Sequence, residues 1–178
     1  TTLADPARAG RNAWAQPLLT GLALAAWEQL APDLPAPVAV AGQSVGELAA
    51  FAVAGVFDRN GAVALADARA QTMDACAEAL PATGLLGVSG LSPVQRDALC
   101  TRWGLQVAID AGIDTAVLGG PRDALAAAAR DAQHGNARCT PLNVAMASHT
   151  TWLQAASLTF GAVLRDWPMR PAHTALFS

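Results

Sequence analysis

Lysine is absent from this chain of 178 residues: all 11 basic residues are arginine, and they lie scattered between Arg8 and Arg170 without forming a run. With 14 acidic residues, the formal net charge is −3 at pH 7. Nucleic acids and anionic membranes are bound by clustered positive charge, so this pattern argues against a polybasic surface of either kind. Long apolar runs are also absent, because Gly, Pro or charged residues interrupt each stretch before the roughly 18 residues that a membrane span needs. We therefore expect no nucleic-acid partner and no membrane association.

Cysteine is scarce as well. Cys76, Cys100 and Cys139 are odd in number and widely spaced, which fits neither a disulfide framework nor a metal-binding C-x-x-C pair. The N-terminus shows no basic-then-apolar signal pattern. These features favour a reducing compartment, and we expect a cytoplasmic protein without a metal site.

Apolar residues make up 53% of the chain and charged residues 14%. A chain of this balance buries enough surface to offset its conformational entropy, which excludes disorder. The length fits one domain, or one domain with a small insertion.

Patterns in the first part of the chain indicate helices packed on a parallel sheet. The expected elements are a buried helix over 18–30, a strand over 38–41, and helices over 45–55 and 59–80. Pro17 falls in the first turn of the first helix, and Asp58 is placed to cap the last. The run from Val38 to Ala41 is short and wholly apolar, as in a strand buried on both faces of a parallel sheet.

The middle of the chain follows a different order. Strands are expected over 84–91, 105–111, 115–119 and 137–144, and helices over 93–102 and 121–135. This is the β-α-β-β-α-β order of a ferredoxin-like unit. We predict an α/β fold in which a ferredoxin-like subdomain, residues 82–143, is inserted into a parallel-sheet body of residues 1–81 and 144–178. The body resumes with a helix after His149 and a strand near 175–178; two strands are too few for such a sheet, so we expect it to be incomplete at both ends.

A G-x-S-x-G motif, Gly42 to Gly46 with Ser44 at its centre, lies between an expected strand and an expected helix. The glycines allow a sharp turn that exposes the serine. The Val45 N–H and the helix N-terminus then face negative charge that develops on a bound carbonyl oxygen. This context indicates a nucleophilic serine; a plain strand-to-helix turn is the alternative.

A serine hydroxyl needs a neighbouring base, and the chain has three histidines. His149 is the best candidate because it follows an expected strand, where the catalytic groups of an α/β sheet gather. His134 at a helix end and His173 near the C-terminus are better explained as surface and loop residues.

Several segments of the chain resemble the malonyl-CoA:acyl carrier protein transacylase family, which includes the acyltransferase domains of polyketide synthases. These segments are Gln43–Glu47 with the helix that follows to Val56, Ala66–Met73, Ala147–His149 and Ala15–Leu19. The resemblance covers almost the whole chain. The fold that it implies, an α/β-hydrolase-like body with a ferredoxin-like insertion, agrees with the element order above.

The resemblance implies a role for each matching residue. Ser44 would be the nucleophile that takes the acyl group from coenzyme A, and His149 would be its base. Arg69 would grip the free carboxylate of malonate, a role that suits the guanidinium fork. The alternative for Arg69 is a solvated position, or an ion pair with Asp67 or Glu47.

Further positions complete the implied site. Gln16 would help to hold the pocket, and Val45 would supply one oxyanion-hole N–H. Met146 and Ala147 precede the histidine in the segment that tunes the choice between malonyl and methylmalonyl groups, and malonyl is expected by default. The implied substrate is malonyl-CoA, the implied partner is an acyl carrier protein, and no cofactor is expected to be bound.

The chain departs from the family pattern at some points. Gln43 stands where the family usually has histidine, directly before the nucleophile, and its amide still allows hydrogen bonds there. The Gly-Gln-Gly motif that supplies the second oxyanion N–H is missing from residues 1–178, as is the Asn or Gln that orients the catalytic histidine. We expect both outside this chain, which would then be an internal part of a larger protein.

Two other classes of function stay open. A serine esterase or thioesterase of the α/β-hydrolase class shares the turn and takes its acid from between the serine and the histidine, here Asp110 or Asp114. A non-catalytic docking subunit would keep the fold without the chemistry. Within the family, the residues fit fatty acid biosynthesis, polyketide biosynthesis and malonate decarboxylase alike.

Overall fold

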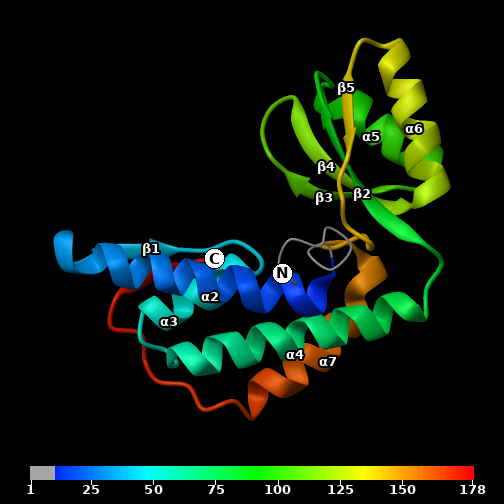
Figure 1. The fold of residues 1–178 in the computed structure, drawn as a ribbon. Helices are drawn as coiled ribbons and strands as arrows, with labels where there is room; N and C mark the ends of the chain where they lie inside the picture. Colours follow the sequence, from blue (N-terminus) through cyan, green and yellow to red (C-terminus); the bar gives the residue numbers. More distant parts are fainter. Residues whose placement is uncertain (1–10) are drawn as a thin grey trace, which may run out of the picture. The chain divides into compact units, whose positions relative to one another are not determined.

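A computed structural model describes residues 11–178 (Figure 1). Residues 1–10, which include Arg8 and the beginning of the expected body, lie outside the described residues. The chain divides into two compact units, one up to Asp74 and again from Leu158 to Ser178, the other from Ala75 to Ser157. The second unit contains the expected subdomain, residues 82–143, and extends beyond it at both ends.

The first unit combines helices with a pair of parallel strands. Its elements are α2 (Asn12–Leu30), η2 (Ala31–Asp33), β1 (Ala39–Ala41), α3 (Gly46–Val53), α4 (Arg59–Glu78, to residue 74 in this unit), the end of α7 (Gln154–Arg165) and β6 (Ala175–Phe177). β1 and β6 pair in parallel, with Val40 opposite Leu176. The predicted cap of α4 is confirmed, because the Gly61 N–H donates to Asp58 Oδ1 over 2.7 Å.

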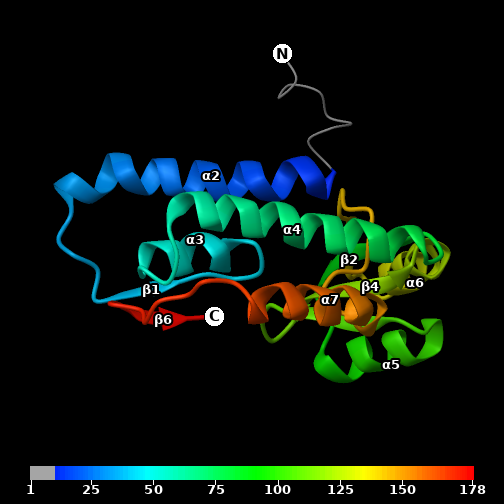
Figure 2. The same cartoon turned by 90° about the horizontal axis from the view of Figure 1, so that it is seen from below.

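Helices α2 and α4 lie side by side and antiparallel (Figures 1 and 2). Near one end of the pair, Asn12 Nδ2 donates to Asp74 Oδ1 over 2.9 Å. Near the other end, Arg59 Nη1 donates to Glu28 Oε2 over 2.9 Å. This pairing brings residues 16 and 69 opposite each other, although they are far apart in sequence.

The core of the first unit surrounds α3 and the beginning of α4. Its buried members are Leu24, Leu48, Ala49, Ala54, Val56, Phe57, Ala62, Leu65 and Ala66. Alanine is frequent in this set, so the helices approach closely and few bulky side chains fill the space. Because α3 packs into this core, the turn that precedes α3 begins from a fixed helix.

The expectation that α2 is a buried helix starting at Leu18 is wrong. The helix begins at Asn12, and Pro17 lies inside it. Its buried residues are Gln16, Thr20 and Leu24, whereas Leu22 is 68% exposed. This face meets α3 and, through the hydrogen bonds of Gln16, α4, whereas the leucine-rich face stays exposed.

The expectation that the strand at 38–41 is buried on both faces is also wrong for the described residues. Ala39 and Ala41 are exposed and Val40 is half-buried. Because β1 pairs only with β6 in a two-stranded sheet of the described chain, little of its surface is covered.

The second unit is built on an antiparallel sheet. Its elements are β2 (Thr83–Ser89), α5 (Pro93–Trp103), β3 (Gln106–Asp110), β4 (Thr115–Pro121), α6 (Arg122–His134), β5 (Arg138–Pro141), η3 (Thr151–Leu153) and the beginning of α7. The strands lie in the order β3-β4-β2-β5, and all neighbours are antiparallel. The element order from β2 to β5 is the β-α-β-β-α-β order predicted from the sequence.

Helices α5 and α6 pack against this sheet and share its core. The core contains Leu86 and Val88 from β2, Leu118 from β4, Leu99 from α5 and Ala128 from α6, among others. The predicted start of α5 is confirmed by a capping box, in which the Gln95 N–H donates to Ser92 Oγ and the Ser92 N–H donates to Gln95 Oε1.

Residues 11–178 therefore form a mixed α/β structure with one parallel and one antiparallel sheet. Within residues 11–178, no helix combines the length and the apolar character that crossing a membrane requires.

Candidate active site

Ser44 occupies a strained turn between β1 and α3. Its φ angle is 57°, in the left-handed region that residues other than glycine rarely adopt. A Cβ atom at Gly42 would lie 2.6 Å from both Cα and N of Glu47, so the turn closes only around a glycine. The sharp turn that the G-x-S-x-G motif predicts is present, and Ser44 lies at its tip.

Glu47 closes this turn from within α3. The Ser44 N–H donates to Glu47 Oε1 over 3.3 Å, and the Glu47 N–H donates to the Ser44 carbonyl over 3.2 Å. The Glu47 carboxylate thus satisfies one backbone donor ahead of α3, and the second bond joins two backbone groups of the turn. From the sequence, Glu47 is expected only as an alternative ion-pair partner of Arg69; an acidic residue in the first turn of the helix is the signal for its contact with the turn.

Gln43 and Val45 flank the serine in the same turn. The Gly46 N–H donates to the Gln43 carbonyl over 3.0 Å. Val45 has helical angles, φ −61° and ψ −27°, directly before α3. The backbone N–H of Val45 therefore belongs to the first turn of that helix, where the partial positive charge of the helix dipole is concentrated.

Arg69 reaches the serine from α4. Its Nη2 group donates to Ser44 Oγ over 3.1 Å, and its Nη1 group donates to Gln16 Oε1 over 2.6 Å. Burial lowers the pKa of the Arg69 guanidinium from its ordinary value, and the negative charge of Glu47 acts in the opposite direction. A guanidinium stays protonated at physiological pH, so a partly desolvated positive charge lies beside the hydroxyl.

Gln16 holds the other end of this guanidinium. The side chain is buried, 5% exposed, and its Nε2 group donates to Met73 Sδ over 3.3 Å. With its oxygen toward Arg69 and its nitrogen toward Met73, the Gln16 amide has one orientation. The structure thus links Gln16, Arg69 and Ser44 in a single chain of hydrogen bonds.

The alternative interpretations of Arg69 do not describe these contacts. Asp67 accepts a hydrogen bond from Gln71 Nε2 over 2.7 Å. Glu47 attracts Arg69 by its charge, while the guanidinium donates hydrogen bonds to Gln16 and Ser44.

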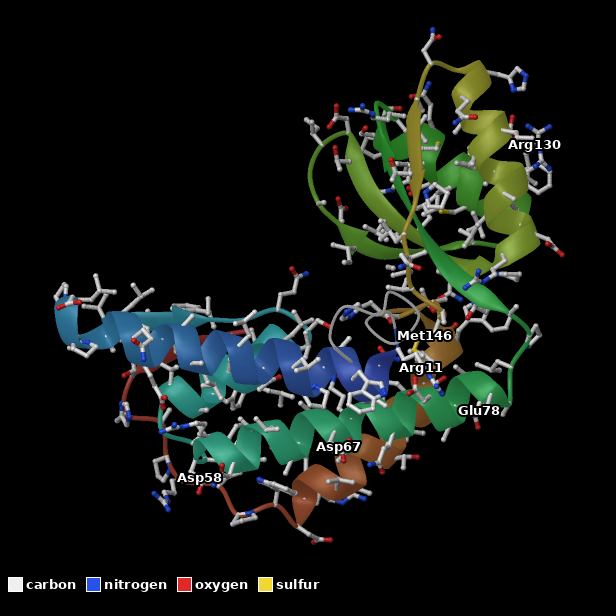
Figure 3. The ribbon with its side chains drawn as sticks, viewed as in Figure 1. Arg11, Asp58, Asp67, Glu78, Arg130 and Met146 are labelled. Carbon is white, nitrogen blue, oxygen red and sulfur yellow. The ribbon has the colours of Figure 1, made fainter. Side chains whose placement is uncertain are left out.

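The segment that carries His149 belongs to the second unit. Met146, seen on the chain after β5 in Figure 3, and Ala147 are both buried. His149 has a φ angle of 62°, again in the left-handed region. His149 and Ser44 belong to different units, and their pairing stays a prediction from the sequence.

The other histidines have structural contacts. His134 Nδ1 lies 2.6 Å from the Arg130 carbonyl on the exposed end of α6. The His173 ring packs over Gly55, whose φ of 86° and lack of a Cβ leave room for it. No group of three His, Cys, Asp or Glu side chains that could hold a metal ion occurs in residues 11–178.

The site thus places a serine at a strained strand-to-helix turn beside a half-buried arginine that donates to its hydroxyl. Residues 8–176 match the acyl transferase domain family, and the chain belongs to this family. Curated relatives include the malonyl CoA-acyl carrier protein transacylase of Mycobacterium tuberculosis, 36% identical over 155 residues, which are 85% of this chain and 50% of the relative. Polyketide synthase GfsB of Streptomyces halstedii is 43% identical over 83 residues, 47% of this chain and 1% of that protein.

Solved structures agree with this assignment. MCAT from Mycobacterium tuberculosis superposes with a TM-score of 0.83 at 31% identity, covering 98% of this chain and 58% of that one. The acyltransferase domain of an iterative polyketide synthase in enediyne biosynthesis gives a TM-score of 0.78 at 29% identity, covering 93% of this chain and 44% of that one. The chain spans about half the length of the transacylase that it matches.

Proposed function

We propose that the protein transfers a malonyl group from coenzyme A to the phosphopantetheine thiol of an acyl carrier protein through an acyl-serine intermediate. The observation that carries this proposal is the hydrogen bond of 3.1 Å from Arg69 to Ser44 Oγ. Support also comes from the similarity of the chain to a malonyl CoA-acyl carrier protein transacylase and to a polyketide synthase.

The spacing of Arg69 and Ser44 suits a short acyl group that ends in a carboxylate. In a malonyl ester of Ser44, one methylene separates the ester carbonyl from the carboxylate. A guanidinium within hydrogen-bond distance of Oγ is then within reach of that carboxylate, and its fork matches the two oxygens. An acetyl group offers no such partner, so the partly desolvated guanidinium of Arg69 gains no ionic contact from it.

The reaction follows from these roles. Ser44 Oγ attacks the thioester carbonyl while His149 takes the hydroxyl proton, and the Val45 N–H stabilises the oxyanion. The carbon–sulfur bond then breaks, and coenzyme A leaves as a thiol with the proton from His149. In the second half, His149 takes the proton of the carrier-protein thiol, and the sulfur attacks the ester carbonyl of the acyl-serine. The bond from that carbonyl to Ser44 Oγ then breaks, and His149 returns the proton to Oγ.

The remaining predicted residues complete this proposal. Gln16 holds Arg69 toward the serine, Gln43 lies at the rim of the turn, and Met146 and Ala147 bound the acyl group. Malonyl is preferred over methylmalonyl by default. The first unit would form part of an α/β-hydrolase-like body, and the free cysteines fit the cytoplasm. Fatty acid or polyketide biosynthesis would use the product, with malonate decarboxylase as a third setting.

The esterase alternative has less support. Asp110 Oδ2 accepts from Arg96 Nη1 over 3.0 Å, and Asp114 Oδ1 accepts from Thr115 Oγ1 over 3.0 Å. Both candidate acids of a Ser-Asp-His triad thus have other partners. A docking subunit would have no need of the hydrogen bond that the half-buried Arg69 donates to Ser44 Oγ.

A transfer assay tests the proposal. The protein is incubated with malonyl-CoA and a carrier protein bearing phosphopantetheine, and the mass of the carrier is followed. We expect carrier malonylation that depends on Ser44 and His149. Release of free coenzyme A and malonate without carrier malonylation would favour the esterase, and neither product would favour the docking subunit.

A further inference from the structure

The segment around His149, residues 146–151, needs external support. It follows β5 and ends at Thr151, the first residue of η3, and His149 adopts the left-handed backbone region. A non-glycine residue keeps such a conformation only where surrounding contacts impose it. The contacts around this segment therefore decide where the imidazole points.

Thr83, the first residue of β2, binds the segment on the N-terminal side of His149. The Thr83 side chain is buried, and its Oγ1 accepts a hydrogen bond of 3.1 Å from the Ala147 N–H. The Ala147 carbonyl in turn accepts from Thr150 Oγ1 over 2.6 Å. Both polar groups of a fully buried residue are thus satisfied, one by the sheet and one across His149.

Gln106, the first residue of β3, binds the segment on the C-terminal side. Its Nε2 group donates to Thr151 Oγ1 over 2.6 Å, and its Oε1 atom accepts from the Thr151 N–H over 2.9 Å. Two bonds from one planar amide fix both the position and the direction of the Thr151 backbone.

Gly119 on β4 leaves room for the segment because it has no side chain. A Cβ atom there would lie 2.7 Å from Thr150 Cγ2 and 3.3 Å from Ala147 Cβ. Three neighbouring strands of one sheet thus meet the segment on both sides of His149. Rigid strands hold a functional side chain more accurately than a loop does by itself.

From these contacts we infer that Thr83 and Gln106 are positioning residues for His149. This inference rests on the proposed function, because it gives His149 the role of the base. Neither residue touches the reacting atoms; each acts through the backbone of the segment. A small displacement of a catalytic base lowers the rate of chemistry more than the binding of substrate.

Paired variants test the inference. Thr83→Val keeps the shape of the side chain and removes the acceptor, whereas Thr83→Ser keeps the acceptor. Thr101→Val is the matched control, because Thr101 is exposed and its Oγ1 donates to the Asp97 carbonyl within α5. We expect kcat of Thr83→Val to fall about 10- to 100-fold with KM for malonyl-CoA little changed, and Thr83→Ser and Thr101→Val to stay near wild type.

A second readout does not depend on turnover. The chain has three histidines, so the Cε1–Hε1 signal of His149 can be assigned by NMR with His134→Gln and His173→Gln variants. We expect Thr83→Val to shift or broaden this signal, and Thr83→Ser to restore it. If the wild type transfers no malonyl group, the proposed function fails. The NMR comparison still decides whether Thr83 determines the position of the His149 imidazole.

An unchanged kcat together with an unchanged His149 signal in folded Thr83→Val would overturn the inference. If that variant does not fold, Gln106→Ala carries the test at a solvent-accessible site. We expect the same loss of kcat and the same change of signal there, and wild-type values for both would overturn the inference equally.

Discussion

Arg69 Nη2 on α4 donates a hydrogen bond to Ser44 Oγ over 3.1 Å, which joins the middle of a long helix to the tip of a strained turn. The two residues are 25 positions apart in sequence. The pairing puts a positive charge beside the hydroxyl of the proposed nucleophile.

Replacing Arg69 separates carboxylated from neutral acyl groups. We expect Arg69→Ala to lower kcat/KM for malonyl-CoA about 10- to 100-fold, the range set by losing a hydrogen-bonded charge. The discrimination against acetyl-CoA should fall with it, because no buried charge then lacks a partner. Acylation rates with the two thioesters measure this ratio.

The control for that variant is Arg59→Ala. Arg59 is an exposed arginine on the same helix, and it pairs with Glu28. We expect its removal to leave the malonyl-to-acetyl ratio unchanged. Retention of malonyl selectivity by Arg69→Ala would contradict the role given to Arg69.

Glycine is required at position 42. A Cβ atom there would meet the backbone of Glu47 at 2.6 Å, and backbone cannot move aside cheaply. We expect Gly42→Ala to reduce the free energy of unfolding by about 1–3 kcal/mol, as overpacking does. Urea titration measures the loss.

Gly21→Ala is the matched control for Gly42→Ala. Gly21 lies inside α2, and a Cβ atom there has nothing within 4 Å. Alanine in a helix interior should raise stability by about 0.5–1 kcal/mol. Equal effects of the two variants would show that the close approach at Gly42 is not what limits the turn.

Glu47 should matter mainly through its side-chain oxygen. Glu47→Ala removes the acceptor of the Ser44 N–H, and we expect it to destabilise the protein by about 1 kcal/mol and to slow acylation of Ser44. Glu47→Gln keeps an oxygen acceptor and should recover most of both losses. Thermal unfolding and the acylation rate follow the two variants, and equal losses in both would assign the effect to the charge instead.

Local patterns predicted much of this structure. The order of elements from β2 to β5, the cap at Asp58, the start of α5 and the turn at Ser44 each depend on residues close together in sequence. Such contacts leave a signature in spacing, as the G-x-S-x-G motif does.

Other features depend on partners far along the chain and left no such signature. The buried face of α2 carries Gln16, which bonds to Arg69 and Met73 of α4, so a count of leucines selects the wrong side. Thr83 and Gln106 bind residues 64 and 45 positions away, and nothing in their neighbouring sequence indicates it.

The raised pKa values of two thiols predict how stability changes with pH. Burial raises the pKa of the Cys100 thiol, with the charge of Asp97 acting in the same direction, and burial also raises the pKa of Cys139. The folded state then keeps these protons at a pH where the unfolded chain loses them. Stability is therefore full below the unfolded-state pKa, about 8.5, and falls as the pH rises above it.

Urea titrations between pH 7 and pH 10 test this dependence. We expect the free energy of unfolding to decline above the unfolded-state pKa in the wild type, and to decline less in Cys100→Ala. The same slope in both proteins would remove Cys100 as a source of the effect.

The most direct test of the central claim is the intact mass of the protein after brief incubation with malonyl-CoA and, separately, with acetyl-CoA, followed by peptide mapping. We predict a malonyl-sized adduct on Ser44 that is absent in Ser44→Ala and weak with acetyl-CoA. A folded protein that forms no adduct with either thioester, or an adduct at a residue other than Ser44, would contradict an acyl-serine mechanism selected by Arg69.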